Sequence, residues 1–423
     1  MKFRRGLIPL LFALAACFLS ACGGETATPV PDRSTKIVST RPQVPSHPPT
    51  AALQASTTPL PTATVRSSTL PIREVTKNCA DWVDWDFSRL SLKDVLIFVD
   101  FSPANEKKTF STLSPDTGIM EPLPDLPGFL TPFGPPGNAK RFAYIDDQMR
   151  VILVNANGGI EAASPFQRHW HSALIWLDDQ NLLVSYDPVS TSERNVEVFN
   201  PITNETQILN SERSDGYTFQ VEHAGHFVWK QMYDPTLTRL TYTRETDSHD
   251  AVITMIDVGN GEILWEMKRA STGLDYPPIW SKDGSRMAVI ANGDREFNYK
   301  NFEIFLVDSE GAGTQWVDLR ETPEITAEDY QWSPDGRYLA IYGTSVFILD
   351  TKEQRLVDYC IPLSETGYFF GPAVPIIWSP NSQQVIFQRE ALPAVLVDLL
   401  DGMVTPLTGD PNLLPVAWLA TAP

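Results

Sequence analysis

The sequence predicts an all-β fold, a β-propeller built from seven four-stranded antiparallel blades. The main observation is a motif that recurs at spacings of 43, 57, 47, 52 and 46 residues. In each copy an aromatic residue ends one strand, a tight turn follows, and an alternating strand begins. The 423-residue chain is 42% apolar, which is enough to form a large core. A unit of four short strands repeated at this period is typical of propeller blades.

The repeats differ in how well they keep the motif. The clearest copies begin at Trp280, Trp332 and Trp378, and weaker copies begin at Phe133, Trp176 and Tyr233. After Trp332 comes Ser-Pro-Asp-Gly, in which Pro fixes φ, Asp accepts backbone hydrogen bonds and Gly accepts a positive φ. An alternating strand over 338–342 and a third strand ending in Asp350 follow. Each repeat therefore predicts at least three antiparallel strands, and a fourth completes the blade.

The two ends of the domain predict how the ring closes. Strands over 95–100 and 107–113 form a blade that precedes the six repeats. The last repeat ends near Leu407, which leaves 415–419 as an additional strand. We expect this strand to be the first strand of the blade formed by 92–123, because joining both ends of the chain in one sheet leaves no open edge. The first two blades are degenerate, so counts of six or eight remain open.

These repeats resemble the WD-repeat-like propeller units of the TolB-like family. The resemblance covers nearly all of 86–423 and is strongest over 279–388. It implies the propeller fold but no particular activity, because propellers host many unrelated functions. The spacing departs from TolB-like members, which combine six blades with a separate α/β domain.

The N-terminus predicts export and membrane anchoring. Basic residues at positions 2, 4 and 5 precede an apolar segment, 6–20, that is too short to span a membrane. The following Leu-Ser-Ala-Cys-Gly, with Cys22 as its cysteine, resembles the lipobox of bacterial lipoproteins. That resemblance implies a signal peptide over 1–21, acyl chains on Cys22 and an extracytoplasmic protein held at the cell envelope. The alternative is an ordinary signal peptide with an incidental cysteine.

A tether separates the predicted anchor from the propeller. The segment 22–75 is rich in Thr, Pro and Ser, and its part from 26 to 75 has 9 Pro, 10 Thr and 6 Ser but no aromatic residue. Such a composition cannot bury enough apolar surface to fold, so we expect disorder there. The propeller domain is expected over 76–423. The chain's net charge of −19, which becomes −22 once the basic signal segment is removed, argues against a nucleic-acid partner.

Two cysteines remain after cleavage and lipidation. Cys79 starts the segment that enters the first blade, and Cys360 ends the last strand of the sixth. An even number of cysteines in an exported protein predicts a disulfide, which would pin the N-terminal arm to the ring near its closure. Closing a loop of about 280 residues would stabilise the fold by about 4–5 kcal/mol. The alternative is two buried free thiols.

The candidate ligand contacts lie in connections between blades. His169 and His226 each precede the next repeat's aromatic residue by seven positions, so they occupy equivalent loops. Loops of this kind open on the face where propellers commonly bind ligands. The full set of predicted contacts is His169, Trp170, His171, His223, His226, Tyr368, Phe369 and Phe370. His169 and His226 are weak metal candidates without a third ligand, and capping histidines and core aromatics are the plainer interpretation.

The sequence favours a non-catalytic function. It contains no Gly-x-Ser-x-Gly nucleophile motif and no phosphate-binding glycine loop, so we expect no cofactor. The segment 292–298 has oxygen ligands for a hard cation, but a solvated loop explains it equally well. We therefore expect a binding or scaffolding module for an envelope protein, peptide or glycan. The alternative is an envelope enzyme, such as a hydrolase, lyase or metal-dependent lactonase, with its site in the propeller funnel.

Overall fold

The computed structural model describes the strands and most of the short turns that join them. The described residues are 70–79, 94–100, 109–113, 119–123, 126, 129–131, 140–148, 150–164, 173–178, 180–186, 195–211, 231–245, 251–269, 278–292, 302–319, 327–362, 376–389, 392–408 and 410–420. They belong to one compact unit within 61–423. All the regular elements among them are β-strands, and no helix in this part of the chain is long and apolar enough to cross a membrane.

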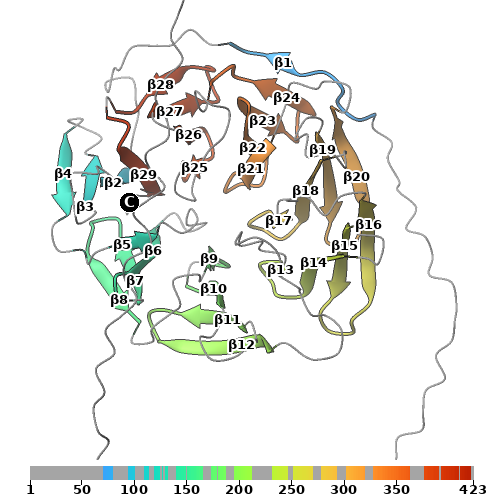
Figure 1. Cartoon of the computed structure of the whole chain (residues 1–423), viewed down its shortest axis with the longest axis horizontal. Helices are drawn as coiled ribbons and strands as arrows, with labels where there is room; N and C mark the ends of the chain where they lie inside the picture. Colours follow the sequence, from blue (N-terminus) through green and yellow to red (C-terminus); the bar gives the residue numbers. More distant parts are fainter. Residues whose placement is uncertain are drawn as a thin grey trace, which may run out of the picture. The chain divides into compact units, whose positions relative to one another are not determined.

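The strands form seven antiparallel sheets, the predicted blades, which Figure 1 shows arranged in a ring. Blade 1 consists of β29 (Leu413–Leu419), β2 (Val95–Asp100), β3 (Thr109–Leu113) and β4 (Met120–Leu123), and blade 2 consists of β5 (Phe129–Thr131), β6 (Arg141–Asp146), β7 (Val151–Asn155) and β8 (Ile160–Ala163). Blade 3 consists of β9 (Ala173–Trp176), β10 (Leu182–Tyr186), β11 (Asn195–Asn200) and β12 (Glu205–Ser211), and blade 4 consists of β13 (Gln231–Tyr233), β14 (Arg239–Glu245), β15 (Ala251–Asp257) and β16 (Ile263–Arg269).

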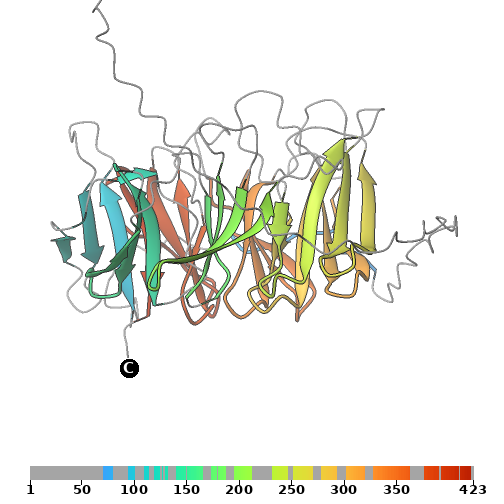
Figure 2. The ribbon, with the colours of Figure 1, turned by 90° about the horizontal axis from the view of Figure 1, so that it is seen from below.

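Blade 5 consists of β17 (Ile279–Trp280), β18 (Arg286–Asn292), β19 (Phe302–Asp308) and β20 (Gly313–Asp318). Blade 6 consists of β21 (Ala327–Trp332), β22 (Tyr338–Gly343), β23 (Val346–Asp350) and β24 (Arg355–Asp358). Blade 7 consists of β25 (Ile376–Trp378), β26 (Gln384–Arg389), β27 (Leu392–Asp398) and β28 (Val404–Pro406). The first strand of each blade lies nearest the ring axis and the last lies at the rim (Figure 1). Figure 2 shows the strands crossing the thickness of the ring. The protein is a seven-bladed β-propeller.

The ring closes as the sequence predicts. The C-terminal strand β29 pairs antiparallel with β2, from Val95 opposite Leu419 to Asp100 opposite Leu413. The first blade thus contains both ends of the propeller. The prediction of seven blades is confirmed, and the alternative counts of six and eight are excluded.

The hydrophobic core is divided among the seven seams between neighbouring blades. Alternate residues of a strand point to opposite faces of its sheet, so each blade contributes to two seams. The seam between blades 6 and 7 contains Tyr342, Trp378 and Phe387, all less than 7% exposed. At the ring centre, the indole nitrogen of Trp378 donates to the carbonyl of Gln331 at 3.3 Å, and Trp332 makes the same bond to Ile279 at 3.2 Å. In blades 6 and 7 the repeated Trp therefore joins neighbouring blades, whereas the buried indole nitrogen of Trp280 has no partner among the described residues.

The turns between first and second strands define one face of the ring, which we call the turn face. In blade 6, Ser333 Oγ donates to Asp335 Oδ1 at 2.6 Å and accepts from the backbone nitrogen of Tyr338 at 2.9 Å. The Asp335 nitrogen donates to Ser382 Oγ at 3.0 Å, which links the turns of blades 6 and 7. The Ser and Asp of the repeat are thus used within the turns, as their turn chemistry predicts.

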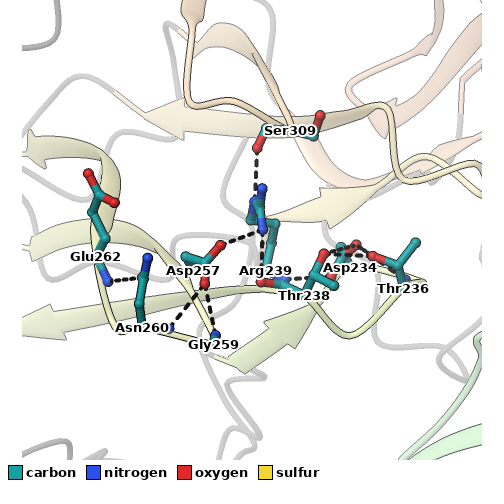
Figure 3. A network of polar contacts seen from close by, with 9 residues as sticks. All are labelled: Asp234, Thr236, Thr238, Arg239, Asp257, Gly259, Asn260, Glu262 and Ser309. Carbon is teal, nitrogen blue, oxygen red and sulfur yellow. Dashed lines mark hydrogen bonds and ion pairs between the residues drawn. The ribbon is translucent and has the colours of Figure 1, made fainter.

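In blade 4 different residues make the hydrogen bonds that hold this turn (Figure 3). Asp234 replaces the Ser and accepts from the backbone nitrogen of Arg239 at 2.7 Å and from the Thr236 hydroxyl. The Arg239 guanidinium then donates to Asp257 Oδ2 at 2.8 Å and to the carbonyl of Ser309 in blade 5 at 3.0 Å. This network stabilises the turn face across the seam between blades 4 and 5.

Two equivalent glycines provide a matched stability test of that seam. Gly261 and Gly311 occupy the turn before the last strand of blades 4 and 5, with φ of +73° and +86°. A Cβ at position 311 would overlap the carbonyl of Leu264, whereas one at 261 would meet no atom within 4 Å. We expect Gly261→Ala to cost about 1 kcal/mol through φ alone, and Gly311→Ala about 3 kcal/mol or more. Chemical denaturation of both variants measures the difference, and equal costs would contradict the predicted overlap.

An N-terminal arm, residues 70–79, crosses the outer edges of blades 5 and 6. Ile72 bridges to Val317 of β20, and β1 (Thr76–Lys77) adds to β24 as a fifth, parallel strand of blade 6. Cys79 then forms a disulfide with Cys360. The expected domain boundary at residue 76 falls within this arm. The disulfide connects to blade 6, so blade 7 separates it from the closing blade.

Candidate functional site

Four described polar residues that have no role in a turn lie toward the face opposite the turn face. Because β21 runs toward its turn at 333–337, Asp329 lies in the half of the strand farther from the turn face. β22 and β26 run away from the turn face, so Tyr342, Gln388 and Arg389 lie at the same opposite end. We call these four residues the opposite-face cluster. They belong to the first and second strands of blades 6 and 7, on the axial side of each sheet.

Asp329 is half-buried and, among the described residues, accepts one hydrogen bond from the backbone. It follows a bulge in β21, pairs with Tyr342 across the sheet, and accepts from the nitrogen of Tyr330 at 2.7 Å. Burial raises the pKa of its carboxyl group to about 7, and this hydrogen bond offsets only part of that effect. At neutral pH the carboxyl group is therefore divided between its charged and neutral forms.

Tyr342 and Arg389 face each other across the seam between blades 6 and 7. The Tyr342 side chain is 1% exposed and Arg389 is 9% exposed. Burial lowers the pKa of the Arg389 guanidinium, while the nearby Tyr342 acts in the opposite direction. Arg389 Nε donates to the carbonyl of Pro362 at 3.0 Å, which fixes the side chain against the segment that follows the disulfide.

Gln388 contributes a hydrogen-bond acceptor at the neighbouring seam. Its side chain is 1% exposed, and Nε2 donates to the carbonyl of Pro415 in β29 at 2.6 Å. Its Oε1 is buried and has no hydrogen-bond partner among the residues that the structure describes. An unsatisfied buried acceptor costs about 1–3 kcal/mol. A ligand or water that donates a hydrogen bond to Oε1 would recover part of this cost.

The cluster offers hydrogen-bond donors, acceptors and one carboxyl group that exchanges its proton near neutral pH. Such a set suits amides and hydroxyls, the polar groups of peptides and glycans. Among the described residues, no three His, Cys, Asp or Glu side chains are grouped so that they could hold a metal ion.

A hollow of about 470 Å³ on the turn face is the second candidate. It is lined by Leu177, Asp178, Gln180 and Lys282 from the turns of blades 3 and 5. Burial alone would raise the pKa of Asp178, but hydrogen bonds from Asn181 and two backbone nitrogens lower it below its usual value. The carboxylate is already used by its own turn, so this hollow is a weaker candidate than the opposite-face cluster.

The structure tests one of the predicted sites directly. The disulfide between Cys79 and Cys360 is present. The other predicted site residues lie outside the described part of the chain. They are Cys22 of the predicted lipobox and the predicted ligand contacts His169, Trp170, His171, His223, His226, Tyr368, Phe369 and Phe370.

Sequence reasoning missed the opposite-face cluster, although the repeat contains a signal for part of it. Counting ten residues from the repeated Trp gives Ile290, Tyr342 and Gln388 at equivalent positions. A carboxamide therefore stands where another blade has an aliphatic side chain. The sequence signal for Asp329 is an acidic residue inside the first strand of a blade.

Comparisons with known proteins give structural neighbours alone. No family model matches the sequence, and no curated protein matches it. A periplasmic gluconolactonase, PpgL of Pseudomonas aeruginosa, aligns with a TM-score of 0.48 at 13% identity, covering 77% of this chain and 99% of that chain. TolB of Acinetobacter baumannii aligns with a TM-score of 0.40 at 14% identity, covering 77% and 82%.

A third structural neighbour is a lyase. An oligogalacturonate lyase of Vibrio parahaemolyticus aligns with a TM-score of 0.43 at 11% identity, covering 78% of this chain and 87% of that chain. Because a shared fold does not define a function, the activity of this chain has to be argued from its own residues.

The raised pKa of Asp329 predicts that stability depends on pH. Between about pH 4 and 7 the folded state retains a proton that the unfolded carboxyl group has lost, so stability falls as pH rises. The difference between this pKa and the ordinary pKa of an aspartate corresponds to about 4 kcal/mol, and partial solvent access reduces this figure. We expect Asp329→Asn to flatten this dependence in urea denaturation at pH 5, 6, 7 and 8. An unchanged pH profile would contradict the assignment.

Proposed function

We propose that this protein is a lipid-anchored, extracytoplasmic binding or scaffolding module that holds a protein, peptide or glycan at the cell envelope. The disulfide supports the compartment, because such bonds persist mainly in oxidising environments. The resemblance of the N-terminus to a lipobox supports acylation of Cys22 and attachment to a membrane.

The observation that carries the binding function is the unsatisfied Oε1 of Gln388. This atom is buried near the axial strands, at the face opposite the turns. Gln388 itself is 1% exposed, so a ligand group donating to Oε1 would enter a largely dehydrated environment, where hydrogen bonds are strong. A donor such as an amide N–H or a sugar hydroxyl fits this position.

A panel of glycans and peptides tests the binding function. We expect at least one member to bind, and Gln388→Met to weaken that binding about fivefold to tenfold, the effect of one lost hydrogen bond. Gln180→Met, on the turn face, is the control and should bind like the wild type. Thermal unfolding of both variants separates lost binding from lost folding. Equal affinities in the two folded variants, or no binding by the wild type, would contradict the proposal.

The proposed anchor has a separate test. In a bacterial host, wild-type protein is expected in the membrane fraction, with an acylated N-terminal residue by mass spectrometry. Cys22→Ser should release the protein from the membrane or leave the signal peptide uncleaved. An unmodified residue 22 in the wild-type protein would refute lipidation and leave the binding test unaffected.

An envelope enzyme is the second candidate, and Asp329 is the observation that favours it. A carboxyl group with a pKa near 7 is suited to general acid or base catalysis. If turnover of a glycan or lactone panel occurs, Asp329→Asn should lower it by at least a hundredfold without unfolding the protein. Metal analysis of the wild type and of His169→Ala and His226→Ala variants tests the metal-dependent form of this alternative.

A further inference from the structure

The N-terminal arm is held to the propeller by few non-covalent contacts. The Ile72 nitrogen donates to the Trp316 carbonyl at 2.9 Å, and the Asp318 nitrogen donates to the Ile72 carbonyl at 2.9 Å. Ile72 and Val75 are partly buried against the core between blades 5 and 6. Further along, the Asn78 nitrogen donates to the Asp358 carbonyl at 2.8 Å. These contacts join blades 5 and 6 across the seam between them.

Ordering the arm costs at least as much free energy as these contacts supply. Fixing one residue's backbone costs about 1–2 kcal/mol, and a typical hydrogen bond returns about 1 kcal/mol. Three backbone bonds outside the short β1 pairing and two half-buried aliphatic side chains therefore hold this segment only marginally. The disulfide supplies the missing stabilisation by keeping the arm next to its binding edge.

The propeller half of this junction is organised by blade 6 itself. Asp358 Oδ1 accepts from the Cys360 nitrogen at 2.7 Å and from the Ser345 hydroxyl at 2.6 Å. Ser345 Oγ in turn accepts from the nitrogen of Ile361 at 3.0 Å. These bonds, all made by residues outside the arm, hold Cys360 in its positive-φ conformation, φ +55°. Cys79 on the arm is exposed to solvent. The receiving thiol is thus preformed, and the bond that it makes is open to attack by external thiols.

We propose that the outer edges of blades 5 and 6 form a strand-addition site for the arm of a second copy, opened when thiols cleave the Cys79–Cys360 disulfide. The edge fits this segment in four ways: β24 offers two parallel register positions, β20 offers a bridge, the core between the blades offers an apolar contact for two aliphatic side chains, and Cys360 offers a thiol at the end. An identical arm from another copy makes the same contacts, so exchange loses no interaction. The result is an arm-exchanged, covalently linked dimer.

The exchange is balanced without a net oxidant. A small-molecule thiolate attacks one sulfur of the Cys79–Cys360 bond, forming a mixed disulfide and releasing one protein thiolate. When the arms have changed places, the Cys79 thiolate of one copy attacks the mixed disulfide at Cys360 of the other and releases the small thiol. Two intramolecular disulfides are thereby replaced by two intermolecular ones, and the thiol is regenerated.

Isotope mixing tests this proposal with the full chain. Equal amounts of ¹⁵N-labelled and unlabelled protein, both carrying Cys17→Ser and Cys22→Ser, are incubated in a glutathione buffer, quenched with acid and digested without reduction. We expect Cys79–Cys360 peptides that join a labelled and an unlabelled half, up to roughly half of the total at full exchange. Their fraction should rise with protein concentration and be absent without thiol.

A competing peptide tests the specificity of the edge. In the same buffer, a synthetic peptide of residues 70–79 should be captured at Cys360, and capture should fall at least tenfold for the peptide carrying Ile72→Asp and Val75→Asp. Disulfides that stay within one isotope although alkylation shows the bond to be cleaved would overturn the proposal. So would a bond that resists thiols, mixed-isotope bonds between two Cys79 residues, or equal capture of the two peptides.

Discussion

A chain that ends at Asp410 is expected to lose its cooperative folded state. The deletion removes β29, which pairs with β2 along its whole length and contributes Val416, Trp418 and Leu419 to two seams. Each of these side chains is less than 7% exposed, and burying each contributes about 1.5–3 kcal/mol. With the other apolar residues of the strand, the loss is roughly 10 kcal/mol, comparable with the whole stability of a typical domain.

The matched control is a chain that ends at Ala420, which retains β29. We expect the control to show one sharp unfolding transition by circular dichroism or calorimetry. The shorter chain should show none, or should aggregate because β2 is left as an open, apolar edge. A cooperative transition within a few degrees of the control would mean that β29 is not needed to close the ring.

Removing the disulfide is expected to lower stability by about 5 kcal/mol in the chain-entropy model, because the bond closes a loop between residues 281 positions apart. For a domain of this size the melting temperature should fall by roughly 5–10 °C. The measurement compares wild type, Cys79→Ser, Cys360→Ser and the double variant by calorimetry. Since all three variants lack the same bond, they should melt together.

A second measurement separates the arm from the ring. In the Cys79→Ser variant, hydrogen exchange at the amides of Ile72, Asn78 and Asp318 should accelerate more than at the core strand β23. These amides make the bonds between the arm and the blade edges, or lie beside them. Unchanged melting temperature together with unchanged exchange would show that the disulfide contributes nothing to holding the arm.

The fold could be predicted because the repeat encodes local geometry. The Trp-Ser-Pro-Asp-Gly turns have side-chain hydrogen bonds that form within five residues, so their sequence signal is strong. The ring closure followed from one spare strand at the C-terminus. The parallel addition of β1 could not be predicted, because Thr76 and Lys77 lie in a short polar stretch whose pairing partner is 281 residues away.

The candidate site was predictable only in part. Gln388 differs from its counterpart Ile290, which a closer comparison of the repeats would have revealed. The partial burial of Asp329 and the proximity of Tyr342 to Arg389 depend on how two blades pack, and residue spacing alone carries no such information. The predicted loop contacts remain predictions, because those residues lie outside the described part of the chain.

The attachment of the arm also determines where mechanical load enters the molecule. A pulling force applied to the chain before Leu70 acts first on the contacts between the arm and the blade edges and then on the Cys79–Cys360 disulfide. It therefore passes into blade 6 before it reaches β2, whose pairing with β29 depends on hydrogen bonds and packing alone. With the bond intact, the junction that closes the ring is shielded from tension; with the bond reduced, the same pull would act directly on β2.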